Sequence, residues 1–207
     1  MIKVAIAGEF QDGKSTLINA LCGCNCAETG YGVATTQEPR EYPLPGAEVI
    51  LVDTPGFNSV REGDSEQACR GISGADACLY MLSEKQFTGR MWEDLKRALS
   101  LTGGFYKPLV PFINDRGRNN RAIAESSLAA MRLNGLQPVL FGNEMPVIHA
   151  RAWQKGRVDD EEYKVGMRRI EYLLGLYPAQ TVSPLEKICC LHRKLISCLD
   201  YLETSKK

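Results

Sequence analysis

Short apolar runs alternate with stretches in which apolar residues recur every three or four positions, and this alternation predicts a succession of strands and helices. The apolar runs predict strands over residues 2–7, 38–44, 47–52, 75–82, 109–113 and 146–150. Helical spacing is found over residues 14–21, 91–101 and 122–133, and again after Asp159, where Tyr163, Met167, Ile170 and Leu174 share a face. The polar, glycine-rich stretch after residue 52 predicts a loop up to about Ser73.

Strands that alternate with helices in this way favour an α/β fold. The sheet is expected to be doubly wound and mostly parallel, with helices on both faces and ligands at the carboxyl ends of the strands. Pro39 and Pro43 lack an N–H group for the ladder, so they favour an edge position for the strand at residues 38–44.

The last segment is set apart by a helix-start pattern at Ser183. A capping serine is followed by proline at the first helical position and by Glu186 at the third. Spacings of three and four then separate Leu185, Ile188, His192, Leu195, Leu199 and Leu202. This stripe suits a helix packed on its own domain and also a helix that meets a partner or a second copy. We therefore divide the chain into a domain at residues 1–178 and a C-terminal helical segment at residues 179–207.

Charge and composition exclude several classes of protein. Lysine plus arginine and aspartate plus glutamate number 25 each, so no overall field favours nucleic acid or an anionic membrane. No apolar run approaches the roughly 18 residues needed to span a bilayer. The first residues are interrupted by Glu9 and Asp12 and do not fit a signal peptide. We expect a cytoplasmic protein whose eight cysteines are reduced.

The most informative motif lies between the first predicted strand and helix. Residues 8–15, Gly-Glu-Phe-Gln-Asp-Gly-Lys-Ser, fit the phosphate-binding pattern G-x-x-x-x-G-K-[ST]. The glycines let successive N–H groups point at phosphate oxygens, Lys14 reaches the β- and γ-phosphates, and the Ser15 hydroxyl can ligate Mg²⁺. The predicted nucleotide contacts here are Gly8, Asp12, Gly13, Lys14, Ser15 and Thr16. The chain is expected to bind a nucleoside phosphate.

A second motif follows the predicted strand at residues 47–52. Asp53 begins the sequence Asp-Thr-Pro-Gly and can hold Mg²⁺ through water, while the Gly56 N–H can bond a γ-phosphate whose loss releases the next loop. Between the two motifs, Thr36 is preferred over Thr35 as the hydroxyl that completes the Mg²⁺ shell, the alternative being an ordinary loop. The predicted metal ligands are Ser15, Thr36 and Asp53.

Together these residues resemble a known family. The run Gly-Glu-Phe-x-x-Gly-Lys-Ser-Thr-Leu-Ile-Asn-Ala-Leu, the Thr-Thr loop and Asp-Thr-Pro-Gly are similar to the Era-like and bacterial dynamin-like P-loop GTPases of the translation-factor-related class. The resemblance is strong over residues 1–82 and weaker to about residue 155. It implies a Ras-like sheet, GTP or GDP and Mg²⁺ as ligands, and slow GTP hydrolysis coupled to loop movement in a switch or assembly module.

The chain departs from this family where the guanine base is recognised. The family carries Asn-Lys-x-Asp, whereas residues 114–117 are Asn-Asp-Arg-Gly, so the aspartate that pairs with guanine is replaced by Gly117. A Ser-Ala-Lys-like position is occupied by residues 149–151, His-Ala-Arg. The base contacts that the resemblance implies are Asn114 and the Ala150 N–H, which could meet the guanine O6. Asp115 stands at the lysine position and is a further candidate, because it could take over the role of the missing aspartate. We expect GTP to be preferred over ATP by a reduced margin, and an ATP-using protein is the rival interpretation.

The group that orients the attacking water is also altered. Phe57 stands where Ras has glutamine, a replacement shared by Era-like and dynamin-like members, which use a monovalent cation or a partner residue instead. Gln11 is the corresponding candidate ligand for K⁺. The predicted catalytic residues are Gln11, Lys14 and Thr36. Weak hydrolysis that a homodimer or partner assists through the switch loops or C-terminal helix is expected, and a module with little or no hydrolysis is the alternative.

Two further sets of residues have open interpretations. Arg61 and Arg70 can stabilise charge or form surface salt bridges. The cysteines at positions 22, 24 and 26 form C-x-C-x-C, whose spacing is closer than that of the usual zinc and iron–sulfur signatures. A buried Cys22 with two loop thiols is the simpler interpretation, and a metal clip is the alternative.

Overall fold

The centre of the molecule is a six-stranded sheet. In the computed structural model, which describes residues 1–30, 36–57, 63–82, 89–101, 104–115, 121–140, 144–176 and 183–204, the strands are β1 Ile2–Gly8, β2 Arg40–Pro43, β3 Val49–Asp53, β4 Ala77–Leu82, β5 Leu109–Asn114 and β6 Val147–Ile148. Their order is β2-β3-β1-β4-β5-β6, and all neighbours are parallel except β2, which runs antiparallel to β3. The α/β fold with a mostly parallel sheet is confirmed, and the proline-containing strand does lie at an edge.

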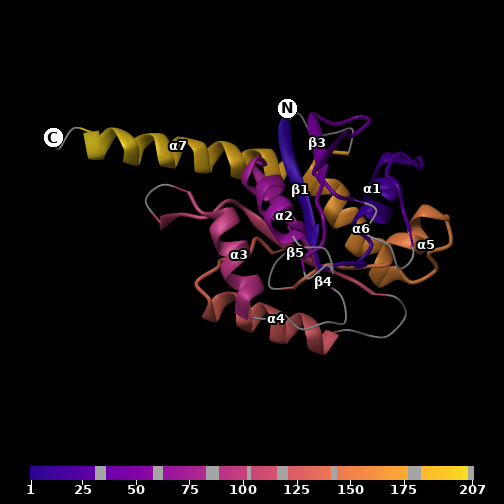
Figure 1. The fold of residues 1–207 in the computed structure, drawn as a ribbon. Coiled ribbons are helices and arrows are strands. Elements are labelled where there is room, and N and C mark those ends of the chain that lie inside the picture. The colour runs from indigo at the N-terminus through magenta and orange to yellow at the C-terminus, as the bar shows by residue number, and fades with distance from the viewer. Residues whose placement is uncertain are drawn as a thin grey trace.

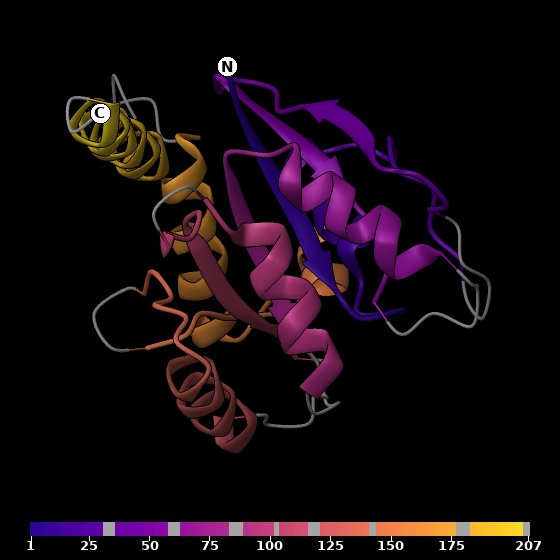
Figure 2. The same ribbon diagram turned by 60° about the vertical axis from the view of Figure 1, so that its left-hand side comes forward.

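Helices cover both faces of this sheet (Figures 1 and 2). They are α1 Lys14–Cys22, α2 Asp64–Ser73, α3 Gly89–Leu99, α4 Arg121–Leu133, α5 Ala150–Gln154, α6 Glu161–Leu174 and α7 Pro184–Thr204. One core cluster joins the sheet to α1, α6 and the start of α7, and a second joins it to α2, α3 and α4. β4 and β5 are buried along their whole length, which agrees with the continuous apolar runs at residues 77–82 and 109–113 of the sequence.

Two predictions of local structure were wrong. The stretch predicted as a loop up to Ser73 contains α2, a polar helix that buries Ala68, Cys69 and Ile72 on one side. Its high content of polar residues concealed this narrow apolar face. The strand predicted at residues 146–150 is reduced to the two residues of β6, and Ala150 instead begins α5.

The carboxyl ends of the strands bring the two phosphate-site motifs of the chain together at one end of the sheet. Ile6 of β1 is opposite Asp53 of β3, and Gly8 is opposite Met81 of β4. The pairing continues past β3, since Glu9 forms a parallel bridge with Phe57. The loop at residues 8–15 and the Asp-Thr-Pro-Gly motif are therefore neighbours in space.

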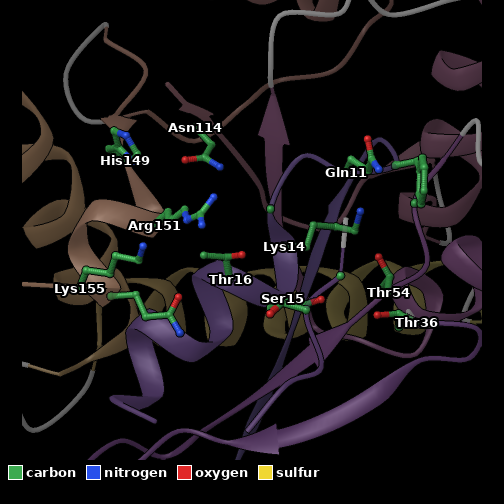
Figure 3. Close-up of a pocket in the computed structure, with 16 residues that line it drawn as sticks. Gln11, Lys14, Ser15, Thr16, Thr36, Thr54, Asn114, His149, Arg151 and Lys155 are labelled. Carbon is green, nitrogen blue, oxygen red and sulfur yellow. The ribbon is translucent and has the colours of Figure 1, made fainter. Parts of the chain in front are cut away.

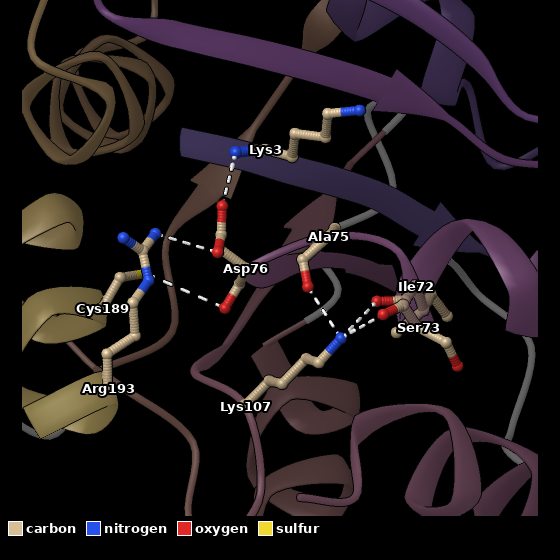
Figure 4. A network of polar contacts seen from close by, with 8 residues as sticks. All are labelled: Lys3, Ile72, Ser73, Ala75, Asp76, Lys107, Cys189 and Arg193. Carbon is tan, nitrogen blue, oxygen red and sulfur yellow. Dashed lines mark hydrogen bonds and ion pairs between the residues drawn. The ribbon is translucent and has the colours of Figure 1, made fainter. Parts of the chain in front are cut away.

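The first turns of α7 pack on the domain at the opposite end of the sheet. Leu185 and Cys189 are buried, and the Ser183 hydroxyl accepts a hydrogen bond from the Glu186 N–H (3.0 Å), as the capping pattern predicted. Arg193 forms an ion pair of 2.9 Å with Asp76, which also accepts the backbone N–H of Lys3 (Figure 4). In Figure 1, α7 then extends away from the sheet.

The division at residue 178 stays a prediction. Residues 177–182 lie outside the described part of the chain, as do the side chains of Leu195, Leu199 and Leu202 in the predicted stripe. Leu185, the first member of the stripe, packs on the domain itself.

Candidate functional site

The loop after β1 is held in shape by Asp12. The buried carboxylate accepts the Glu9 N–H (2.7 Å), and the Asp12 N–H donates to the Glu9 carbonyl (3.3 Å). Gln11 and Gly13 have positive φ angles of 68° and 98°, so the chain turns sharply before α1 begins. The Asp12 side chain thus stabilises the shape of the loop. It points into the loop and not toward a ligand.

Lys14 lies across the mouth of this loop. Its side chain is buried, and its ammonium donates to the carbonyl oxygens of Glu9 (2.7 Å) and Gly8 (3.4 Å). The positive charge is therefore held over a turn rich in backbone N–H groups, at the start of α1. This arrangement is suited to binding phosphate.

A cavity of about 660 Å³ opens beside the loop (Figure 3). The predicted site residues that line it are Gln11, Gly13, Lys14, Ser15, Thr16, Thr36, Gly56 and Asn114. Predicted residues that do not line it are Gly8, Asp12, Asp53, Asp115 and Ala150. Residues that sequence reasoning did not assign to it are Phe10, Thr29, Gly30, Thr54, His149, Arg151, Gln154 and Lys155. Its volume suits a small-molecule ligand.

Three segments converge on the carboxylate of Asp53. The hydroxyls of Ser15 and Thr36 each donate to Asp53 Oδ2 at 2.9 Å. The other oxygen, Oδ1, is buried and has no hydrogen-bond partner among the described residues. Burial raises the pKa of Asp53, while the nearby Lys14 charge and the two hydroxyl bonds act in the opposite direction. An orphaned carboxylate oxygen beside two hydroxyls is a donor set that a hard divalent cation prefers.

The Asp-Thr-Pro-Gly segment is packed tightly on the phosphate-binding loop. A Cβ at Gly56 would lie 2.5 Å from backbone atoms of Phe10, so no side chain fits there. The Phe57 ring is buried and stacks with Tyr80 at a centroid distance of 6.4 Å. Its N–H donates to Gly8 (3.1 Å) and its carbonyl accepts from Phe10 (3.0 Å). Phe57 is therefore a packing residue.

At the base end of the cavity, Asn114 connects two loops. Its amide Nδ2 donates to the Asp12 carbonyl (2.7 Å), and its Oδ1 accepts the Ala150 N–H (3.1 Å). The Ala150 N–H that we expect to meet guanine O6 is thus held by Asn114, and its role toward a base stays a prediction. Gly117 lies outside the described residues.

The Asp115 side chain is directed toward α6 and does not line the cavity. It is 3% exposed, its N–H donates to Ile148 (2.8 Å), and its Oδ2 accepts the hydroxyl of Tyr163 from α6 (3.0 Å). Burial and this hydrogen bond raise the pKa of Tyr163 to about 12, so the phenol keeps its proton at neutral pH. The predicted role of Asp115 in base binding is therefore not supported by its position.

The cysteines at positions 22, 24 and 26 lie at the end of α1 and in the segment that follows it. Cys22 is half-buried, whereas Cys24 and Cys26 are exposed. Burial and the two neighbouring thiols raise the pKa of Cys22 to about 12. Within the described ranges, no three His, Cys, Asp or Glu side chains are grouped to hold a metal ion.

Arg70 pairs with Glu66 at 2.9 Å on the surface of α2, and Arg61 falls outside the described residues. In the part of the chain that the structure describes, no helix is both long and apolar enough to cross a membrane.

Comparison with known proteins agrees with this geometry. A family model described as 50S ribosome-binding GTPase matches residues 3–114. The chain is 32% identical over 122 residues to GTPase Der of Chlamydia muridarum, a match that covers 55% of this chain and 24% of that protein. It is 29% identical over 161 residues to GTPase Era of Stenotrophomonas maltophilia, covering 73% of this chain and 50% of that protein.

The fold is also that of solved members. A structure of Era in complex with MgGDPNP and part of 16S ribosomal RNA superimposes with a TM-score of 0.53 at 24% identity, covering 72% of this chain and 51% of that chain. The chain thus spans between about a quarter and a half of the length of the curated relatives named here.

Proposed function

Because the chain belongs to the family of 50S ribosome-binding GTPases, we propose that it binds GTP and GDP with Mg²⁺ and hydrolyses GTP slowly. In this proposal it works as a nucleotide-dependent switch or assembly module in the cytoplasm, as its Era-like and dynamin-like resemblance implies. A partner or second copy would assist hydrolysis through the switch loops or α7.

The single observation that carries this proposal is the meeting of Ser15 and Thr36 on Asp53. Ser15 belongs to α1, Thr36 precedes β2, and Asp53 ends β3, so residues far apart in sequence supply hydroxyls to one carboxylate. The unpartnered Oδ1 of Asp53 leaves an acceptor for a cation or its water. These three residues would hold Mg²⁺, which when bound neutralises phosphate charge.

Different residues of the chain then have separate roles in binding the nucleotide. Lys14 and the N–H groups at the start of α1 bind the phosphates, and the Lys14 charge favours the negative charge that grows during phosphoryl transfer. The Gly56 N–H is the candidate γ-phosphate contact, because this glycine lines the cavity against Phe10.

Removing one metal-binding hydroxyl should affect binding in a cation-dependent way. Ser15→Ala deletes one of the two donors to Asp53, so we expect GTP affinity in Mg²⁺ to fall by about fivefold to tenfold, with little change in EDTA. Calorimetry in both buffers measures this, with Ser126→Ala on the exposed side of α4 as the control. An equal loss in both buffers would contradict a role in cation binding.

Hydrolysis by the isolated chain should be slow. Phe57 is buried and cannot orient water, so we expect turnover well below about one per minute in Na⁺ buffer, as for unassisted GTPases. Acceleration by K⁺ that Gln11→Ala removes would support cation assistance, because Gln11 lines the cavity. Phosphate release in Na⁺ and in K⁺ at several protein concentrations is the measurement. Equal rates throughout would eliminate both K⁺ activation and self-activation.

A second function is favoured by the same buried Phe57. Without a described group to orient water, the chain can act as a nucleotide-binding module with little or no hydrolysis. Calorimetry with GDP, GTP, ADP and ATP, combined with phosphate release, separates this module from a GTPase and from an ATP-using protein.

A further inference from the structure

Among the described residues, the base end of the cavity presents no carboxylate of the kind that usually pairs with a guanine base. Asp115 accepts the Tyr163 hydroxyl at 3.0 Å, is 3% exposed and does not line the cavity. The neighbouring Asn114 has its amide and its carbonyl oxygen bonded to Asp12 and Ala150. Among the described lining residues there is no aspartate or glutamate. A base entering here finds no described carboxylate for the N1–H and 2-amino groups of guanine.

Two of the side chains that line this end, His149 and Arg151, come from α5 and its cap, and both carry hydrogen-bond donors. His149 Nδ1 accepts the Ala152 N–H (3.2 Å), which assigns the ring hydrogen of a neutral His149 to Nε2. Arg151 carries a forked set of N–H donors. Figure 3 shows Arg151 extending from α5 toward the space between Asn114 and Thr16, with His149 at the same end of the cavity.

The ring of His149 is held in place from behind. Its centroid lies 5.8 Å from that of Tyr163 in an edge-to-face arrangement. Tyr163 therefore performs two tasks, because the same residue binds Asp115 and supports His149. Through these two contacts, Tyr163 keeps the Asp115 carboxylate away from the cavity and supports the His149 ring at the cavity's base end.

The two purines differ in what they offer such donors. The O6 and N7 atoms of guanine are adjacent acceptors, and arginine binds this pair in bidentate fashion. Adenine offers only N7 as an acceptor there, and its 6-amino group is a donor that faces another donor. Donors on His149 and Arg151 would therefore still distinguish guanine from adenine.

We propose that Arg151, with His149 beside it, recognises the O6/N7 edge of guanine in this protein. This inference rests on the proposed nucleotide binding and adds its specificity determinant. Recognition through O6 and N7 would replace recognition through N1 and the 2-amino group, and it would allow guanine binding with Gly117 in the aspartate position.

Base analogues test this directly on the wild-type chain. Inosine diphosphate keeps O6 and N7 but lacks the 2-amino group, and 7-deaza-GDP lacks N7. By calorimetry in Mg²⁺, we expect IDP to bind within about threefold of GDP, and 7-deaza-GDP and ADP to bind about tenfold more weakly. A loss of more than about tenfold with IDP would overturn the proposal, because it would show that the 2-amino group is recognised.

Two variants assign the effect to Arg151. Arg151→Gln should weaken GDP about tenfold and bring GDP and 7-deaza-GDP to within about twofold. Arg157→Gln, which removes an exposed arginine just beyond α5 that does not line the cavity, is the matched control and should leave both values unchanged. If Arg151→Gln keeps the wild-type preference for GDP over 7-deaza-GDP, the proposal is wrong.

Asp115→Asn tests the alternative that Asp115 recognises the base, since this substitution removes the charge but keeps an acceptor for the Tyr163 hydroxyl. The ratio of GDP to IDP affinity should stay within about twofold, and a collapse of GDP affinity with a folded variant would place Asp115 at the base instead. Failure of the proposed function itself has a separate signature, which is that the wild-type chain binds none of the four diphosphates.

Discussion

Lys14→Ala should remove most of the affinity for nucleotide. The lysine ammonium is held over the phosphate-binding loop by the Glu9 and Gly8 carbonyls, so the charge is fixed before a ligand arrives. Hydrogen bonds to charged groups contribute roughly 1.5–3 kcal/mol each, which corresponds to a decrease in affinity of about tenfold or more. Calorimetric titration with GDP is the measurement.

Lys3→Ala is the matched control for charge. Lys3 lies at the other end of β1 and pairs with Glu41 on the surface, so its removal should leave GDP affinity unchanged. If Lys14→Ala binds GDP within a factor of two of the wild type, the assignment of the phosphate loop fails.

Gly166→Ala should strongly destabilise the fold. A Cβ at this position of α6 would lie 1.9 Å from the carbonyl oxygen of Val147 and 3.2 Å from Ile148 Cγ2. The helix must then move away from β6, which costs about 1–3 kcal/mol or more and exceeds the gain of about 1 kcal/mol that alanine brings to a helix. We expect a net loss of about 2 kcal/mol in the free energy of unfolding.

Urea unfolding without nucleotide measures this loss. Gly74→Ala is the control, because its φ of −79° suits alanine and the nearest atom to a Cβ there is 3.4 Å away. It should change the unfolding free energy by less than about 1 kcal/mol. Equal stability of Gly166→Ala and the wild type would mean that α6 does not press on β6 in this way.

The phosphate half of the site was predictable because its residues are contiguous. The loop at residues 8–15 combines backbone N–H groups, a lysine and a serine in one motif, and the strand and helix around it have strong patterns. Asp53 was found for the same reason, since it directly follows a buried strand. Thr36 was preferred over Thr35 as a metal ligand. Of the two, the structure describes only Thr36, whose hydroxyl donates a hydrogen bond to Asp53.

The base half could not be predicted because it depends on contacts between distant residues. The partner of Asp115 is Tyr163, 48 positions later, and no local pattern indicates that the two meet. The five residues of α5 are too few for helical periodicity to show, so Arg151 was placed after a strand. Likewise, β6 has two residues and forms only because Ile113 and Asn114 pair with it.

The anchoring of α7 has a practical consequence for experiments on this chain. Asp76, which binds Arg193, immediately precedes β4, whereas the phosphate loop begins next to Met81 at the far end of the same strand. The length of the central sheet therefore separates the helix from the cavity. A fluorophore, affinity tag or surface linker attached beyond α7 would therefore be far from the cavity. Nucleotide binding could then be measured on an immobilised molecule without disturbing the binding site.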